Sequence, residues 1–176
     1  MNIKKTIFFA TIFLSTLVFA EIPDGYKTVV VKPPFSFNER VVDFNPAISQ
    51  AKVENKSLMI YLGATDCPPC RQYENFLNKN KKALSPYFEK IIVVDIQTWL
   101  RGATLKFKVG ENLYTFDEFN KFIENEKIPY VYPSWFLVTN ELKSASQVRG
   151  KYITNDLKSH QEMIDFLVEF KPISSK

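Results

Sequence analysis

Two mainly apolar runs of strand length stand near the middle of the chain. Residues 57–63 and 90–96 consist mainly of aliphatic side chains, and turn-forming or charged residues bound both runs. Such runs are typical of strands that are buried on both faces, as in parallel sheets. A further strand is predicted for 26–31, where Pro33-Pro34 ends it. We expect 90–96 to be a central strand.

Helical patterns fill the intervals between these strands. Asn45-Pro46 is expected to begin a helix that continues to Glu54, with Asn45 as the N-cap and Pro46 in the first helical position. Its short apolar face would consist of Ile48, Ala51 and Val53. The helical spacing of Tyr73, Phe76 and Leu77 predicts a second helix, which Ser85-Pro86 ends. Strands that alternate with helices in this order predict an α/β fold with parallel strands.

Residues 97–114 fit this alternation least well. Leu105, Phe107 and Val109 alternate with lysines, and 110–112 can turn, so we expect a small hairpin inserted at the edge of the sheet. Thr115 and Glu118 have the spacing of a capping box and predict a helix to about Glu126. Its inner face would consist of Phe116, Phe119, Phe122 and Ile123.

The C-terminal part predicts two antiparallel strands and a helix. Residues 134–139 and 145–152 are the strands, and Asn140-Glu141 turns the chain between them. Thr154-Asn155 would cap the last helix. One side of that helix would carry Leu157, Ile164, Leu167 and Phe170.

The first 20 residues have the layout of a secretory signal peptide. Lys4 and Lys5 precede 15 uncharged residues, and the small residues Val18 and Ala20 stand before Glu21. A membrane-spanning helix needs about 20 apolar residues, so a retained membrane anchor is the less favoured alternative to a cleaved signal peptide. We expect cleavage after Ala20 and export to the periplasm.

The remaining chain has the length of one domain. We divide it into an N-terminal strand and extension (21–41), a folded domain (42–171) and a tail (172–176). The formal net charge is +4, and loss of Lys4 and Lys5 would reduce it to about +2. The lysines are scattered, which argues against nucleic acid as a partner. We expect a monomer.

The chain contains a single pair of cysteines, Cys67 and Cys70, separated by Pro68-Pro69. They stand where the first apolar run gives way to the helical pattern. Two intervening residues allow a small disulfide ring at the start of a helix, and an exported protein would keep such a bond. A bridge that closes so short a loop restrains little chain entropy, so its role is expected to be chemical.

Two other uses of paired thiols do not fit the sequence, and one remains an alternative to thiol-disulfide exchange. Two cysteines and the single histidine, His160, cannot complete a closed tetrahedral zinc site. Covalent haem attachment requires a histidine where this chain has Arg71. The remaining alternative from another class is a copper metallochaperone or metal-binding module that uses both cysteines and a third ligand.

The order of elements around the cysteines resembles the thioredoxin superfamily. A strand leads into Cys-x-x-Cys at a helix start, a strand and a helix follow, and an X-Pro step enters the antiparallel pair. The resemblance covers about residues 42–171. It is greatest to the exported thioredoxin-like modules of bacterial thiol-disulfide interchange proteins, where a short helix resembling 45–56 precedes the active-site strand. It implies a thioredoxin-like fold, in which helices flank a central mixed sheet.

The resemblance also implies an activity. Cys67 would be the attacking cysteine and Cys70 the resolving one of a thiol-disulfide oxidoreductase. Its partners would be proteins with disulfides or thiols and an upstream redox partner that could be membrane-bound. No cofactor is needed. A disulfide-forming oxidase remains an alternative direction of the same chemistry.

A proline of the substrate site follows from the same resemblance. Pro133 matches the family's cis-proline, because it directly precedes the apolar strand 134–139, and Pro129 is the competing candidate. The backbone of Tyr132 would then pair with an extended segment of the substrate. Gly150 matches a glycine in the family's last strand.

Two positions depart from the family. Asp66 stands where tryptophan is usual before the first cysteine, and Tyr61 replaces a buried acid six residues before that cysteine. The internal proton acceptor is therefore not identified by sequence. An adjacent carboxylate at Asp66 would disfavour a thiolate, unless Arg71 folds back onto it. This favours a reductase or isomerase over an oxidase.

The helix N-terminus is expected to activate the first thiol. Only a thiolate attacks a disulfide, and the positive end of the helix dipole would favour it on Cys67. Pro68-Pro69 contributes no N–H donors, which leaves the amides of Cys70 and Arg71 to solvate the sulfur. Cys67 is expected to be exposed and Cys70 buried.

Overall fold

The computed structural model describes residues 21–102, 104–123, 132–142 and 160–169. Several predictions lie outside these ranges. They concern the signal peptide, the strand 145–152 with Gly150, the Thr154-Asn155 cap, and the residues Pro129, Leu157 and Phe170.

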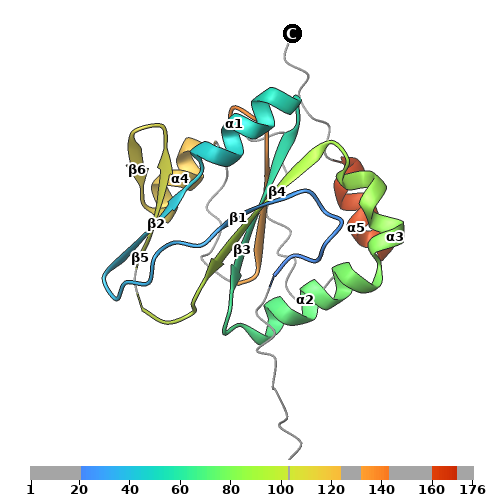
Figure 1. The fold of residues 1–176 in the computed structure, drawn as a ribbon, viewed down its shortest axis with the longest axis horizontal. Helices are drawn as coiled ribbons and strands as arrows, with labels where there is room; N and C mark the ends of the chain where they lie inside the picture. The colour runs from blue at the N-terminus through green and yellow to red at the C-terminus, as the bar shows by residue number, and fades with distance from the viewer. Residues whose placement is uncertain (1–20, 103, 124–131, 143–159, 170–176) are drawn as a thin grey trace, which may run out of the picture.

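A four-stranded mixed sheet forms the centre of an α/β fold (Figure 1). Its strands lie in the order β1 (Thr28–Val31), β4 (Ile91–Thr98), β3 (Ser57–Ala64) and β7 (Ser134–Val138). The first three are parallel, and β7 runs antiparallel to β3. Every residue of β3 and β4 is buried, as expected for apolar runs covered on both faces. The predicted central strands are thus confirmed.

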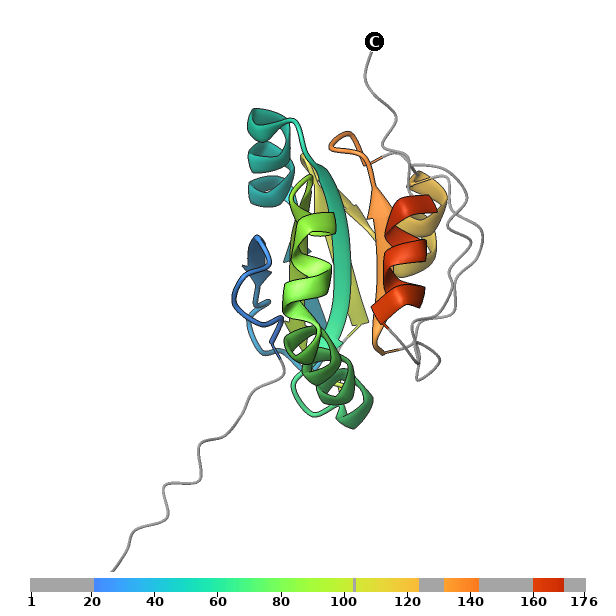
Figure 2. The same cartoon turned by 90° about the vertical axis from the view of Figure 1, so that its right-hand side faces the viewer.

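Helices cover both faces of this sheet. One face packs against α2 (Pro68–Lys79), α3 (Lys81–Leu84), the 3-10 helix η1 (Ser85–Phe88) and α5 (His160–Glu169). The opposite face carries α1 (Asn45–Glu54) and α4 (Phe116–Phe122). Figure 2 looks onto the side with α2, α3 and α5. Alternate residues of β3 enter the two apolar clusters, because successive side chains of a strand point to opposite faces.

The predicted hairpin exists, but not at the edge of the central sheet. β5 (Thr104–Val109) and β6 (Asn112–Tyr114) are antiparallel, and β5 also pairs in parallel with β2 (Glu39–Asp43). These strands form a second, three-stranded mixed sheet in the order β2-β5-β6. The physical reason is that Leu105 and Phe107 bury their apolar sides against the cluster under α1 and α4. β2 was not anticipated from the sequence.

The start of α1 differs from the prediction. Phe44 is the N-cap, and the Asn45 side chain instead exchanges two hydrogen bonds with the backbone of Gly110, at 3.0 and 2.7 Å. Asn45 therefore ties the helix to the turn of the hairpin. Val53, predicted on the apolar face, is 87% exposed, so this prediction is wrong. The fully buried residues of the helix are Ala47 and Ala51. The helix ends at Glu54 as predicted, and its C-cap, Asn55, has a left-handed backbone (φ 50°).

The capping box of α4 is confirmed, whereas its predicted length is wrong. The Thr115 hydroxyl accepts from the Glu118 amide, and the Glu118 carboxylate accepts from the Thr115 amide. The helix ends at Phe122, with Ile123 as its C-cap, rather than near Glu126. Phe122 was predicted on the inner face, but it is partly exposed and stacks on Tyr114 of the hairpin.

Residues 21–26 pack against the central sheet. Ile22 and Tyr26 are buried in the same cluster as α2 and α5, and the Tyr26 hydroxyl donates to the Leu77 carbonyl at 2.9 Å. β1 begins at Thr28, two residues later than predicted. The segment before β1 is therefore part of the core. Within the described ranges, no helix is both long enough and apolar enough to cross a bilayer.

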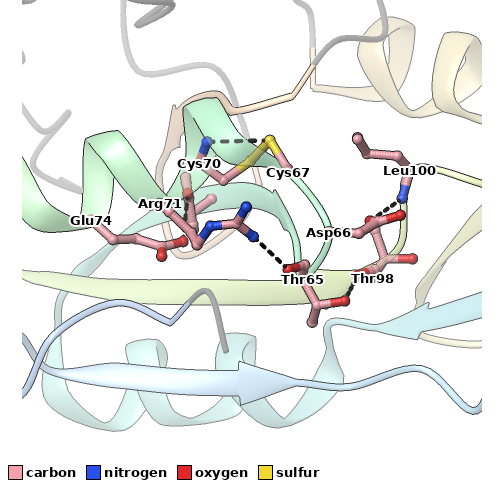
Figure 3. The surroundings of a disulfide bond; sticks show 9 residues. Thr65, Asp66, Cys67, Cys70, Arg71, Glu74, Thr98 and Leu100 are labelled. Carbon is pink, nitrogen blue, oxygen red and sulfur yellow. Dashed lines mark hydrogen bonds between the residues drawn. A yellow bond between two sulfur atoms is a disulfide. The ribbon is translucent and has the colours of Figure 1, made fainter. Parts of the chain in front are cut away.

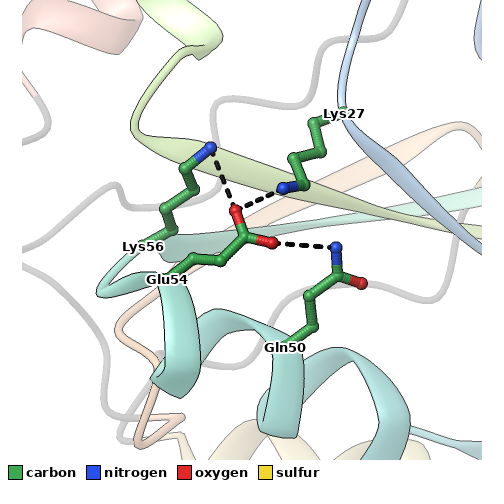
Figure 4. Close-up of polar contacts among 4 residues, drawn as sticks. All are labelled: Lys27, Gln50, Glu54 and Lys56. Atoms are coloured by element: carbon green, nitrogen blue, oxygen red, sulfur yellow. Dashed lines mark hydrogen bonds and ion pairs between the residues drawn. The ribbon is translucent and has the colours of Figure 1, made fainter.

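A charged cluster joins the end of α1 to the start of β1 (Figure 4). The Glu54 carboxylate forms ion pairs with Lys27 and Lys56, and it accepts a hydrogen bond from Gln50 at 3.0 Å. Hydrogen bonds from Lys27 and Gln50 lower the pKa of Glu54 to about 2. The pairs lie at the surface, where ion pairs contribute little to stability.

Arg40 of β2 is a buried cation that fixes the chain after β4. It is 2% exposed, and its guanidinium lies over the rings of Phe35 and Trp99 at 5.4 and 5.1 Å from their centroids. Its four hydrogen bonds go to the carbonyls of Ser36, Trp99 and Arg101 and to the hydroxyl of Thr98. A guanidinium offers five N–H donors in a rigid fork, whereas a lysine ammonium offers three.

Replacing Arg40 with Met is expected to lower the free energy of unfolding by about 2–4 kcal/mol. Methionine keeps much of the apolar volume, but the acceptors around residues 98–101 lose their donor. Urea unfolding of the oxidised protein measures the loss. Arg40→Lys is the matched control and should lose less, because it keeps the charge and part of the hydrogen bonding. A Met variant as stable as the wild-type protein would contradict this account.

Candidate functional site

Cys67 and Cys70 form a disulfide where β3 gives way to α2 (Figure 3). Cys67 is the N-cap of α2, and the two prolines that follow occupy the first positions of the helix. Proline suits these positions, because their N–H groups have no partner inside a helix. The predicted strand-to-helix junction is therefore confirmed, and the last buried residue of β3, Ala64, precedes Cys67 by three residues.

One amide of the helix N-terminus contacts the sulfur of Cys67. The Cys70 N–H donates to Cys67 Sγ at 3.2 Å. The Arg71 N–H, the second expected donor, instead bonds the Cys67 carbonyl oxygen at 3.3 Å. The reason is that Arg71 lies one turn into α2, where its N–H joins the regular helical ladder. The helix therefore supplies one direct donor to the first sulfur.

Both cysteines are buried in the disulfide form. Cys67 is 1% exposed and Cys70 is 0% exposed, and Ala64 and Tyr132 pack against them. The expectation that Cys67 is exposed is therefore wrong for the oxidised protein. The two sulfurs still differ, because among the described residues only Cys67 Sγ accepts an amide hydrogen bond.

Asp66 and Arg71 do not bind each other. The exposed Asp66 carboxylate accepts from the Leu100 amide at 2.7 Å, just after β4. The Arg71 guanidinium donates to the Thr65 carbonyl at 3.2 Å (Figure 3). Arg71 is thus held by the backbone before the first cysteine, and it does not fold back onto Asp66. The Thr65 hydroxyl in turn donates to the Thr98 carbonyl at 3.2 Å.

The peptide bond between Tyr132 and Pro133 is cis, which is the geometry expected from the sequence. Pro133 is buried directly before β7, and the half-buried Tyr132 packs against the cluster that contains both cysteines. The structure thus brings Tyr132 to the disulfide. A role of this pair in substrate binding stays a prediction, and Pro129 lies outside the described residues.

A buried carboxyl group lies one helical turn after the second cysteine. Glu74 of α2 is 7% exposed, and its Oε1 accepts a hydrogen bond from the Tyr61 hydroxyl of β3 at 2.9 Å. Burial raises the pKa of Glu74 to about 7, against a weaker lowering by the bond from Tyr61. Burial also raises the pKa of Tyr61, so its proton stays on the phenol. Glu74 can hold or release a proton near neutral pH.

A second buried acid lies beside this pair. Asp95 of β4 is opposite Tyr61 in the sheet register and is 1% exposed. Its Oδ2 accepts from the Ile22 amide at 3.1 Å and from Gln97 at 2.9 Å, while Oδ1 has no partner among the described residues. Burial raises the pKa of Asp95 to about 6, and its charge further raises the pKa of Glu74.

Glu74 and Asp95 were not predicted from the sequence as residues of the site. A signal for Glu74 was available, since the buried positions of α2 are Cys70, Tyr73, Glu74 and Leu77, which is the spacing of one helical face. Tyr61 stands at the position where the resemblance would place a buried acid, and the acid that contacts it comes from the helix after the cysteines. Asp95 stood within the apolar run of β4, where a single polar residue did not alter the prediction of a strand.

Comparisons with known proteins add no family assignment. No protein-family model matches the chain, and no curated protein matches its sequence closely enough to count as a relative. Within the described parts of the chain, no three histidine, cysteine, aspartate or glutamate residues come together as metal ligands. His160 is the first described residue of α5, which lies within the C-terminal helix that the sequence predicts.

Glu74→Gln is expected to change how stability depends on pH. The pKa of Glu74 is about 7 when folded and near 4.5 when unfolded, so the folded state keeps a proton that the unfolded chain releases. The free energy of unfolding of the wild-type protein therefore falls as pH rises from about 4.5 to 7. The variant has no carboxyl group at this position and does not show this fall. Its free energy of unfolding, relative to that of the wild-type protein, should therefore be higher at pH 8 than at pH 5 by about 1–2 kcal/mol.

Urea unfolding of the oxidised proteins at both pH values makes the comparison. Glu89→Gln, which neutralises an exposed glutamate, is the matched control and should show no such pH-dependent gain. An unchanged difference between Glu74→Gln and wild type at the two pH values would contradict the raised pKa.

Proposed function

We propose that this protein is an exported, periplasmic thiol-disulfide oxidoreductase with a thioredoxin-like fold, which acts on protein disulfides through Cys67 and Cys70. The observation that carries the proposal is the disulfide at the start of α2, with Cys67 Sγ as the acceptor of an amide hydrogen bond. A helix N-terminus lowers the pKa of a cysteine thiol and so favours the nucleophilic thiolate.

The arrangement around the disulfide supports the thioredoxin-like assignment. The cysteines follow a central strand, β3, and the strand after Pro133, β7, lies antiparallel beside it. This matches the order of elements in the resemblance described above. The second sheet and the packed N-terminal segment are additions of this chain to that arrangement.

The proposed exchange conserves atoms and electrons. In the reduced protein, the Cys67 thiolate attacks one sulfur of a client disulfide, forms a mixed disulfide and releases the other client sulfur as a thiolate, which takes up a proton. The Cys70 thiol then loses its proton and attacks Cys67 Sγ. This step breaks the mixed disulfide and releases the second client thiolate. The client gains two electrons, and the Cys67–Cys70 bond forms.

Glu74 is the proposed acceptor of the Cys70 proton. It lies one turn after Cys70 on the inner face of α2, and a pKa of about 7 lets it take up a proton and return it near neutral pH. Tyr61 donates to one carboxylate oxygen and fixes its orientation. Glu74 would thus perform the task of the buried acid that Tyr61 replaces.

The charge beside Cys67 favours a reducing direction. Asp66 precedes Cys67, and Arg71 is held by Thr65, so this guanidinium does not neutralise the carboxylate. A negative charge next to the thiolate destabilises the reduced form. Strong oxidants depend on a stabilised reduced form, so this charge makes the cysteine pair less oxidising. We therefore propose a reductase or isomerase, supplied with electrons by an upstream partner.

Cys70→Ser should retain client proteins as mixed disulfides on Cys67. Without the resolving thiol, the first exchange step occurs and the second does not. Non-reducing electrophoresis with mass mapping, after expression with export, identifies the adducts. Cys67→Ser is the matched control and should trap far fewer clients, because Cys70 lacks the amide bond. Equal trapping by both variants would refute the assignment of roles, and no adduct with either would refute the function.

Asp66→Asn should make the disulfide more oxidising. Asparagine keeps an oxygen for the Leu100 amide but removes the charge, so the pKa of Cys67 should fall by up to about 1 unit. The reduction potential should rise by up to about 30 mV. Alkylation rates against pH and equilibration with glutathione measure the two effects. If both values match wild type, solvent already screens this carboxylate. Glu89→Gln controls for a general change in net charge.

A further inference from the structure

The start of the described chain lies against the buried acids. Figure 1 shows this blue segment running beside α2. Glu21 lines a surface groove of about 420 Å³ together with Arg71 and Glu74 of α2. The groove gives solvent a path to the Glu74 carboxyl group, which otherwise belongs to the interior.

Backbone nitrogens of this segment bind both carboxylates. The backbone of Glu21 makes a hydrogen bond to Glu74 that lowers its pKa. The Ile22 amide donates to Asp95 Oδ2 at 3.1 Å. The Ile22 side chain is 5% exposed within the core, so it holds both nitrogens in place.

We propose that signal cleavage completes this site: hydrolysis of the Ala20–Glu21 bond creates an α-ammonium group on Glu21 that pairs with the carboxylate of Glu74. The inference rests on the export proposed above. Water adds across the peptide bond, so Ala20 leaves with a carboxylate and Glu21 gains an amine, which is protonated near neutral pH. The nitrogen that was a neutral donor in the precursor then carries a positive charge.

The new charge changes what Glu74 can do. An ammonium group beside a partly buried carboxyl group favours the ionised form, and the low dielectric strengthens the pair. Near neutral pH, the mature protein would hold a larger fraction of Glu74 in the ionised, proton-accepting form than the precursor does. Processing would thus couple export to the proton step of the proposed exchange.

Other titratable groups surround Glu74 and contribute to its titration. They are Tyr61 of β3, Asp95 of β4, Arg71 of α2, Lys81 of α3, and the Glu21 and Asp24 side chains of the N-terminal segment. All of them are the same before and after cleavage. A difference between the two forms therefore isolates the α-amino group.

The test compares two forms of the oxidised protein that differ only at the terminal nitrogen. One begins with a free Glu21, and the other is acetylated on that nitrogen, which keeps the N–H donor and removes the charge. Titration of the Glu74 side-chain carboxyl carbon by NMR should give a pKa lower by about 1 unit or more in the free form.

Two further outcomes decide the proposal. In Glu74→Gln with a free Glu21, the pKa of the α-amino group should fall, because the ammonium loses its anionic partner. Equal Glu74 titration in the free and acetylated proteins would overturn the proposal, as would an exported protein whose N-terminal residue is not Glu21. The titration needs no thiol exchange. A protein that shows the shift but traps no client would keep the ion pair and lose the proposed function.

Discussion

β3 and β4 are buried along their whole length, and their burial fixes where the two cysteines lie. Apolar clusters on both faces hold the strands, so the end of β3 has little freedom to move. Cys67 follows three residues after that end, and the two prolines start α2 at once. The disulfide is therefore placed by strands that are buried over their whole length.

The same packing creates the most unusual chemistry of the protein. The face under α2 is apolar over most of its area, yet Glu74 and Asp95 lie within it. Burying an ionised carboxylate is unfavourable, so both groups hold their protons to higher pH than in water. Stability at neutral pH is reduced in return for two titratable groups on this face, of which Glu74 lies one helical turn after Cys70. We regard this as the main sign that the face serves a function.

The chain between β4 and β5 is held from two sides. Arg40 binds residues 98, 99 and 101 from the second sheet, and Asp66 binds Leu100 from the cysteine loop. The second sheet is thereby connected to the backbone that precedes Cys67. A substitution of Arg40 would thus shift Leu100 and, through its bond to Asp66, the backbone next to Cys67, without any direct contact between Arg40 and the disulfide.

Most of the local elements follow from the amino-acid sequence alone. The apolar runs, the capping box at Thr115 and the helix start at Cys67 follow from neighbouring residues, so a single pass along the chain found them. Cys67 and Cys70 as a disulfide, and the strand after Pro133, were predicted for the same reason.

Contacts between residues that are distant in the sequence depend on the fold of the whole chain. Tyr61 and Glu74 are 13 positions apart, and Ile22 and Asp95 are 73 apart, and neither pair has a local signal. The hairpin was found, but its partner strand β2 was not, because alternating patterns do not specify which strand pairs with which. The burial of Cys67 and the separation of Arg71 from Asp66 likewise depend on packing and hydrogen bonds that form only when the whole chain has folded.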